Sequence, residues 1–151
     1  MTAGGGGERQ DRATRPEPEV DATASAELVV SENDLASSLY LASGDAFPPV
    51  FATARMVALM EVAASRLLAP FLGPGELSVG TVVDATHTAA TPPGVRVTAT
   101  ARYLGREDGQ YRFEVIARDH GGEIGRASHR RAIVSTQRLV AGAIRRNGTA
   151  N

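Results

Sequence analysis

Three residues of this chain could together activate water or a hydroxyl group next to a carbonyl: Thr53, Glu61 and His87. A hydroxyl, a carboxylate and an imidazole are the side-chain groups that general acid–base and nucleophilic catalysis use. Each residue also has a structural interpretation, in which Thr53 caps a helix, Glu61 reaches solvent and His87 is a structural histidine on an apolar face. The residue types alone leave both interpretations open.

Residues 52–69, which carry Thr53 and Glu61, predict one long helix. The segment contains no Gly or Pro, is rich in Ala, Leu and Met, and stops at Pro70, as a helix would. Glu61 lies at the edge of its apolar face, and a carboxylate there is costly unless it is hydrogen-bonded or has a shifted pKa. At about 100° per residue, that face consists of Met56, Val57, Met60, Ala63, Ala64, Leu67 and Leu68.

The rest of the chain predicts strands, which would supply cover for so apolar a helix. Alternating apolar and polar residues indicate four long strands after Pro74, joined by turns at residues 91–94, 108–109 and 121–122. A short strand is expected earlier, at residues 27–30. In the first long strand, one face is expected to hold Leu77, Val79, Val83, Ala85 and His87.

These elements predict an α+β protein with the hotdog fold, an antiparallel sheet of about five strands wrapped around one long central helix. Such a sheet leaves edges and an apolar rim exposed, so we expect a homodimer. Residues 1–24 are rich in Gly, Glu, Arg and Pro and are expected to form a flexible N-terminal tail. Residues 25–140 would form the hotdog domain, and residues 141–151 a C-terminal tail.

Composition excludes several classes of function. The formal net charge of −1 gives no electrostatic case for binding nucleic acid or a membrane surface. The absence of Cys removes disulfides, thiolate nucleophiles and cysteine-ligated metals. His87, His120 and His129 lack the spacing of metal ligands, so no metal site is expected. No segment looks like a signal peptide or a membrane span, and we therefore expect a cytoplasmic protein.

Residues 87–94 read His-Thr-Ala-Ala-Thr-Pro-Pro-Gly, the most specific of several short motifs in the chain. These motifs resemble the fluoroacetyl-CoA thioesterase family of hotdog hydrolases. The resemblance extends from Phe47 to Ile133, most of the predicted domain. Further matching segments are residues 50–53, 56–61, 80–81, 123–125 and 129–132.

The resemblance implies a set of site residues. The family's catalytic threonine, glutamate and histidine match Thr53, Glu61 and His87. Its pocket-lid phenylalanine, its glycine beside the acyl pocket and its arginine near the C-terminal strand match Phe47, Gly80 and Arg131. No cofactor is implied, because CoA is part of the substrate.

The chemistry of a thioester suggests a role for each group. His87 would position water or remove a proton from it, as a neutral imidazole can do near pH 7. Glu61 would either orient His87 or attack the carbonyl itself. Thr53 would hold the carboxylate or the thioester oxygen through its hydroxyl group. Backbone N–H groups at the helix start, at Thr53 and Ala54, lack intrahelical partners and could bind an oxyanion.

The chain departs from the family where the acyl pocket is shaped. The family member most selective for fluorinated acyl groups has a second lid aromatic, whereas residues 43–45 here are Ser-Gly-Asp. That family member also has a tryptophan at the position of Val62 and a phenylalanine at the position of Arg55. The sequence therefore supports thioesterase chemistry better than it supports selectivity for fluoroacetyl-CoA.

The expected function is hydrolysis of a short-chain acyl-CoA thioester, fluoroacetyl-type thioesters included, to the free acid and CoA. Two alternatives stay open at this point. One is a hotdog dehydratase or chain-release enzyme that acts on a carrier-bound acyl group. The other is a non-catalytic module that binds acyl groups.

The spacing of Thr53 and Glu61 predicts that the active site is shared between two subunits. Eight residues of helix separate the two side chains by roughly 12 Å along the axis. Both side chains therefore cannot reach one thioester carbonyl from the same regular helix. Either Thr53 precedes the first turn and bends back, or the residues that meet come from two chains.

Overall fold

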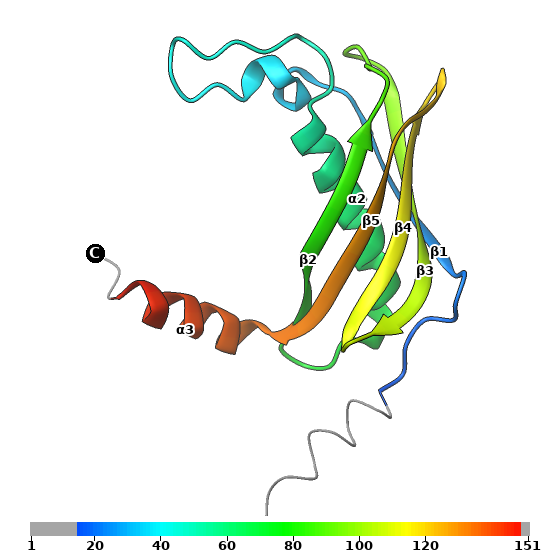
Figure 1. Ribbon diagram of the computed structural model, residues 1–151, viewed down its shortest axis with the longest axis vertical. Coiled ribbons are helices and arrows are strands. Elements are labelled where there is room, and N and C mark those ends of the chain that lie inside the picture. The colour runs from blue at the N-terminus through cyan, green and yellow to red at the C-terminus, as the bar shows by residue number, and fades with distance from the viewer. Residues whose placement is uncertain (1–14, 149–151) are drawn as a thin grey trace, which may run out of the picture.

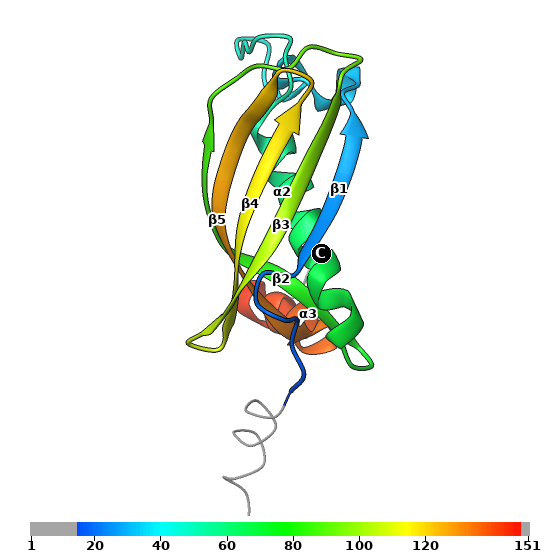
Figure 2. The same ribbon diagram turned by 90° about the vertical axis from the view of Figure 1, so that its right-hand side faces the viewer.

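A five-stranded antiparallel sheet curls around a single long helix, α2, in the computed structural model, which describes residues 15–148 (Figures 1 and 2). The strand order is β1-β3-β4-β5-β2. This arrangement confirms the predicted hotdog fold. The elements are β1 (Thr23–Val29), α2 (Thr53–Leu68), β2 (Glu76–His87), β3 (Arg96–Glu107), β4 (Gln110–Asp119), β5 (Gly122–Ser135) and α3 (Thr136–Asn147), with short 3-10 turns at Glu32–Asp34, Ala36–Ser38 and Ala69–Phe71.

Helix α2 buries its apolar face against the concave side of the sheet. It packs mainly on β1 and β3, whose inward side chains are buried by it. Val62, on the side away from the sheet, is 43% exposed, so cover over the helix is incomplete in one chain. The buried helix residues are Met56, Leu59, Met60, Ala63, Ala64, Leu67 and Leu68.

A buried carboxylate, Asp34, fixes the chain at the start of α2. It accepts hydrogen bonds from the backbone N–H and the hydroxyl of Ser31, both at 2.9 Å. It also accepts two from the Arg55 guanidinium, at 3.1 and 3.0 Å. The Ala52 N–H donates to the Asp34 carbonyl at 2.9 Å. These bonds hold the residue before the helix, and hence the direction in which α2 leaves it.

Among residues 15–148, β5 is the only strand that pairs with β2, which is therefore an edge strand, and a β-bulge at Thr81 interrupts it. Gly80 pairs with Arg131, and Val82 pairs with Arg130, so Thr81 is an extra residue. An extra residue reverses the alternation of side chains. The prediction that one face holds all five residues Leu77, Val79, Val83, Ala85 and His87 is therefore wrong: Leu77 is 55% exposed, and the inward positions at this end of β2 are occupied by Ser78 and Gly80.

The ordered fold begins before the predicted boundary at Ala24. Arg15 donates two hydrogen bonds to the Glu76 carboxylate, at 2.8 and 2.7 Å. The Tyr103 hydroxyl donates to Glu17, and β1 already starts at Thr23. The remainder of the predicted tail, residues 1–14, lies outside the described residues.

A helix follows the last strand. Strand β5 ends at Ser135, and α3 runs from Thr136 to Asn147 across the predicted boundary at residue 140. The Ser135 hydroxyl caps α3 by accepting a hydrogen bond from the Arg138 N–H at 3.3 Å. Within residues 15–148, no helix has the length and hydropathy needed to span a membrane.

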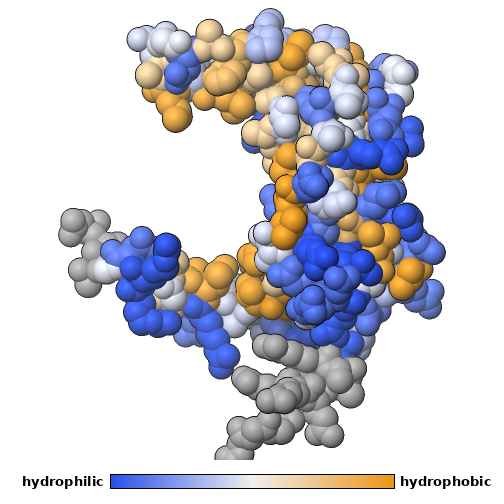
Figure 3. Space-filling view, viewed as in Figure 1, coloured by the Kyte–Doolittle hydropathy of each residue, from blue (hydrophilic) through white to orange (hydrophobic). Residues whose placement is uncertain are grey.

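The described chain has the shape of a hook. Helix α3 and the segment before α2, residues 36–50, here called the arm, project from opposite ends of the β2 edge on the same side (Figure 1). Figure 3 shows hydrophobic surface on the arm, beside β2 and at the base of α3. The exposed apolar side chains of these elements include Tyr40, Leu41, Phe47, Val82, Val83, Leu139 and Val140.

Candidate active site

Thr53 and His87 form a hydrogen-bonded pair where α2 begins and β2 ends. The Thr53 Oγ1 lies 2.9 Å from the His87 Nδ1. Thr53 is the first residue of α2, and its hydroxyl does not cap the helix, because Ala52 occupies the N-cap position without a side-chain bond. The structural interpretation of Thr53 as a cap is therefore replaced by a contact with the imidazole. We call Thr53 and His87 the hydroxyl–imidazole pair.

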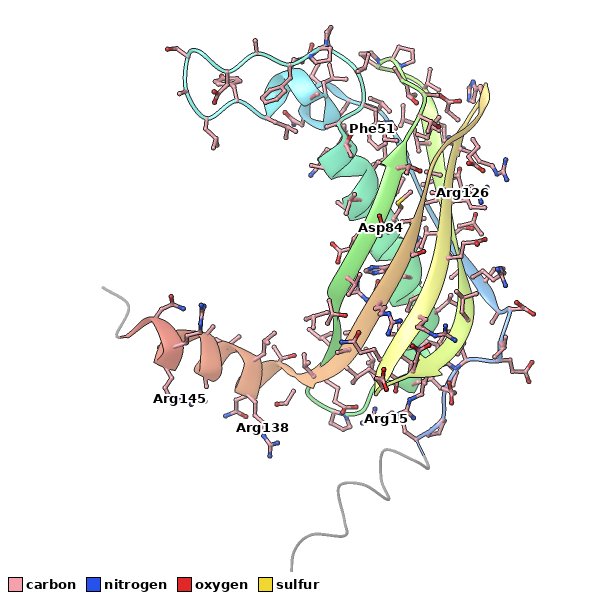
Figure 4. All side chains as sticks on the ribbon, viewed as in Figure 1. Arg15, Phe51, Asp84, Arg126, Arg138 and Arg145 are labelled. Atoms are coloured by element: carbon pink, nitrogen blue, oxygen red, sulfur yellow. The ribbon has the colours of Figure 1, made fainter. Side chains whose placement is uncertain are left out.

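The hydroxyl–imidazole pair lies in the wall of a pocket of about 410 Å³. Phe47 and Phe51 also line this pocket, so the arm supplies part of its wall. Phe51, labelled in Figure 4 at the end of α2 next to the arm, meets the His87 ring edge-on with centroids 6.5 Å apart. Phe47 is 51% exposed. The structure thus places Phe47, His87 and Thr53 at one pocket.

The surroundings of His87 favour its neutral form. Burial lowers the pKa of His87 below its ordinary value, and the backbone of Ala89 offsets part of this effect. The Nε2 is shielded from solvent and has no hydrogen-bond partner within the described part of the chain. A neutral imidazole in contact with an exposed hydroxyl can accept the proton of that hydroxyl.

Glu61 lies in a second group of polar residues, further along α2. Its Oε1 accepts a hydrogen bond from the Arg131 Nη1 at 3.2 Å. The same guanidinium donates from Nε to the Ser78 hydroxyl and from Nη2 to the Ser78 carbonyl, each at 2.9 Å. Its Nη1 also lies 3.2 Å from the His129 Nε2. We call Glu61, Ser78, Gly80, His129 and Arg131 the carboxylate cluster.

Gly80 belongs to this cluster because it leaves room for the carboxylate. A Cβ atom at Gly80 would lie 2.1 Å from the Glu61 Oε1 and 3.2 Å from the His129 Cε1. Burial lowers the pKa of Arg131, and Glu61 offsets part of this effect. The Arg131 side chain is 7% exposed and that of Glu61 is 40% exposed, so the carboxylate is the part of the cluster that an incoming group can reach.

The structure therefore divides the predicted site residues between two places. Among residues 15–148, no hydrogen bond or ion pair joins Glu61 to Thr53 or His87. The start of α2 holds Thr53, and Glu61 follows eight residues later, roughly 12 Å along the axis. One chain thus presents a hydroxyl–imidazole pair and a carboxylate cluster, each without the other.

Sequence reasoning missed two members of the carboxylate cluster, Ser78 and His129. His129 is 2% exposed and lies two residues before Arg131, on the same inward face of β5. Two polar residues on a strand face that is otherwise apolar were a signal for a buried polar network. Ser78 gave no such signal, because the bulge at Thr81 determines which way it points.

The first backbone N–H groups of α2 are available to a ligand. Within the described residues, no hydrogen bond is formed by the N–H of Thr53 or Ala54, whereas the N–H groups of Arg55 and Met56 donate to the Ala52 carbonyl. Donors of this kind stabilise the negative charge that develops on a carbonyl oxygen under attack.

Comparisons with known proteins agree on one family. Residues 30–137 match the model of a family described as fluoroacetyl-CoA-specific thioesterase. The fluoroacetyl-CoA thioesterase of Streptantibioticus cattleyicolor is 48% identical over 93 residues, which cover 62% of this chain and 67% of that protein.

Solved structures give the same result. A mutant of the fluoroacetyl-CoA thioesterase in complex with acetyl-CoA is 39% identical, with a TM-score of 0.81, over 86% of this chain and 99% of that chain. A thioesterase superfamily member from Thermus thermophilus is 30% identical, with a TM-score of 0.77, over 89% of this chain and 96% of that chain.

Proposed function

The chain belongs to the fluoroacetyl-CoA-specific thioesterase family, and from that membership we propose that it hydrolyses short-chain acyl-CoA thioesters to the free acid and CoA. The observation that carries the proposal is the hydroxyl–imidazole pair, with Thr53 Oγ1 and His87 Nδ1 2.9 Å apart in a pocket wall. Family motifs surround both residues. A relative that binds acetyl-CoA has the same fold over nearly its whole length.

We further propose that the working site forms between two copies of the chain. Among the described residues, no carboxylate is bonded to the hydroxyl–imidazole pair, and the imidazole of the carboxylate cluster, His129, has both nitrogens engaged by Val82 and Arg131. Among the described residues, the outer side of strand β2 has no neighbouring strand, and this side runs past both groups, with Val82 and Val83 46% and 38% exposed. In a two-fold dimer packed on this side, the pair of one chain would face the Glu61 carboxylate of the other.

In the proposed reaction, water attacks the thioester carbonyl carbon and the carbon–sulfur bond breaks. The exposed Thr53 hydroxyl takes the proton of the water and passes its own to the His87 Nδ1. The N–H groups of Thr53 and Ala54 stabilise the oxyanion. The His87 proton then goes to the departing CoA sulfur. The Glu61 carboxylate either holds the water or attacks first, forming an acyl anhydride that water hydrolyses.

Mass spectrometry with a panel of short acyl-CoAs tests the reaction class. Release of free CoA supports hydrolysis. Loss of water without CoA release would indicate a dehydratase, and saturable binding without turnover would indicate an acyl-binding module. The variant His87→Ala should lose CoA release while its melting temperature stays close to that of the wild type. Near-full turnover by this variant would refute the role of His87.

Mixing inactive variants tests the shared site. We expect Glu61→Gln and His87→Ala subunits, mixed after partial unfolding, to recover activity, because one site of each mixed dimer receives only wild-type groups. With random pairing, about a quarter of wild-type activity is the expected ceiling.

The matched control mixes Thr53→Ala with His87→Ala. Both residues belong to the same pair of one chain, so every site in the mixed dimer lacks one of them. We expect no recovery. Recovery in the control, or none in the first mixture despite mixed dimers in native mass spectrometry, would refute the shared arrangement.

Oxygen-18 tests whether Glu61 attacks the substrate. In a single turnover in labelled water, direct attack by water places the label in the released acid and none in the protein. After attack by Glu61, hydrolysis of the anhydride at the Glu61 carbonyl leaves the label in the Glu61 carboxylate, whereas hydrolysis at the acyl carbonyl labels the acid. Label in Glu61 therefore identifies attack by Glu61.

A further inference from the structure

His129 is buried in the carboxylate cluster and touches groups from three strands. Its Nδ1 lies 2.7 Å from the Val82 carbonyl oxygen of β2. Its Nε2 lies 3.2 Å from the Nη1 of Arg131, two residues further along β5. Phe113 of β4 packs on the ring, with centroids 6.1 Å apart. The imidazole is therefore held at both nitrogens and on one face.

These two contacts determine where the imidazole proton lies. A carbonyl oxygen only accepts hydrogen bonds, and a guanidinium only donates them. The Nδ1 of His129 must therefore carry the proton, and the Nε2 must offer its lone pair to Arg131. The Arg131 Nη1 that donates to this nitrogen also donates to the Glu61 Oε1. Proton uptake at Nε2 would turn an acceptor into a donor that faces a cation.

We propose that His129 is a positioning residue for the reaction, whose neutral imidazole holds the Arg131 guanidinium in the orientation that fixes the Glu61 carboxylate. The inference rests on the proposed function, because it assigns His129 a part in presenting Glu61 to a thioester. His129 acts through Arg131 and does not itself touch the substrate. Ser78 accepts hydrogen bonds from the Nε and Nη2 of Arg131. Among the described residues, the remaining nitrogen, Nη1, has two acceptors, the Glu61 carboxylate and the His129 Nε2.

The charged groups around His129 agree with a neutral ring. Arg131 of β5 and Glu61 of α2 are the charged residues that face it; β2 contributes the Val82 carbonyl and β4 the Phe113 ring. Burial lowers the pKa of His129 below its ordinary value, and the Arg131 charge lowers it further. The Val82 hydrogen bond and the Glu61 charge act in the opposite direction. Two separate causes thus disfavour the imidazolium.

Nitrogen NMR of the ring tests the contact without any need for activity. We expect Nδ1 to be protonated and Nε2 to be unprotonated at pH 7 in the wild type. In Arg131→Gln, the pKa of His129 should rise, because a neighbouring cation and the donor to Nε2 are both removed. The opposite tautomer in the wild type, or an unchanged titration in Arg131→Gln, would overturn the proposed contact.

Steady-state kinetics test the positioning role. His129→Gln can place its amide oxygen where Nε2 lies, whereas His129→Asn keeps a donor near Val82 but leaves no acceptor for Arg131. We expect His129→Asn to lower kcat roughly 10- to 100-fold, the loss of one hydrogen bond to a charged group, with a smaller change in KM. His129→Gln should retain most of the turnover. His120→Asn, at an exposed turn, is the matched control and should behave as the wild type.

A double variant shows whether His129 acts through Arg131. If it does, adding His129→Asn to Arg131→Gln should cause no further loss of kcat. Equal losses in both backgrounds, or wild-type kcat in His129→Asn, would overturn the inference. If the wild type releases no CoA from any acyl-CoA, the proposed function fails, while the NMR titration still decides whether Arg131 holds the imidazole.

Discussion

Replacing Gly80 by Ala should abolish most of the activity while leaving the fold intact. The new Cβ would lie 2.1 Å from the Glu61 Oε1, against about 3.4 Å for an ordinary contact. The carboxylate must therefore retreat by more than 1 Å. Its hydrogen bond to the Arg131 Nη1 is 3.2 Å long, so it cannot lengthen by that amount and persist. A misplacement of about 1 Å at a reacting group can cost on the order of 100-fold in rate, and we expect kcat/KM to fall by about that factor.

Stability should change little in Gly80→Ala, because the atom that must move is the end of a flexible side chain that is 40% exposed. Two further glycines provide controls. At Gly44, a Cβ atom would meet no atom of the described residues within 4 Å, so Gly44→Ala should leave activity and stability unchanged. At Gly125, a Cβ would lie 2.5 Å from the Thr86 carbonyl oxygen and 2.7 Å from the Met56 Sδ. Overpacking of this kind costs about 1–3 kcal/mol, or roughly 3–10 °C in melting temperature.

The assay is release of CoA from acetyl-CoA, followed with a thiol reagent, together with calorimetric melting of each variant. Wild-type kcat/KM in Gly80→Ala would refute the argument that Glu61 is needed at its present place. A melting temperature as low as that of Gly125→Ala would show that the cluster serves stability instead.

Three further predictions concern pH, the helix start and the lid. Burial lowers the pKa of both His87 and His129 below 6.5. The unfolded chain therefore binds more protons than the folded chain, and the free energy of unfolding should fall as the pH drops from about 7.5 to about 5. Urea denaturation at the two pH values measures this fall, and an equal free energy of unfolding at both would contradict the prediction. Asp34→Ala removes the acceptor of four hydrogen bonds and should cost about 1–3 kcal/mol by calorimetry; an unchanged melting temperature would count against it. Phe47 lines the pocket, but residues 43–45 carry no aromatic side chain. The rates of hydrolysis of acetyl-CoA and fluoroacetyl-CoA should therefore be comparable once the intrinsic reactivity of each carbonyl is allowed for. A large preference for the fluorinated substrate would contradict this prediction.

The fold could be predicted because it depends on local periodicity. The helix predicted at residues 52–69 is observed at Thr53–Leu68, and the alternating segments all became strands. The position of His87 at the end of a strand was predicted correctly for the same reason. The separation of Thr53 from Glu61 followed from the rise of a regular helix, and the structure places the two residues in different groups.

The remainder depended on contacts between distant segments. The bulge at Thr81 is a property of the pairing between β2 and β5, which no alternation within β2 reveals. The bond from Arg15 to Glu76 joins residues 61 positions apart, so local composition assigned Arg15 to a tail. The contact between His129 and Arg131 was visible as a spacing of two in a strand, but their partners, Val82 and Glu61, come from other elements.

The length of α2 has a consequence for communication between sites. Thr53 is the first residue of the helix, and Glu61 follows about two turns later. In the proposed dimer, each helix would therefore contribute Thr53 to one active site and Glu61 to the other. The helix packs on the sheet along its apolar face, and a regular helix would move as a rigid unit. A shift of Thr53 on binding a thioester would therefore displace the Glu61 that serves the opposite site. Occupancy of one site would then alter the affinity of the other, and this cooperativity would be reciprocal.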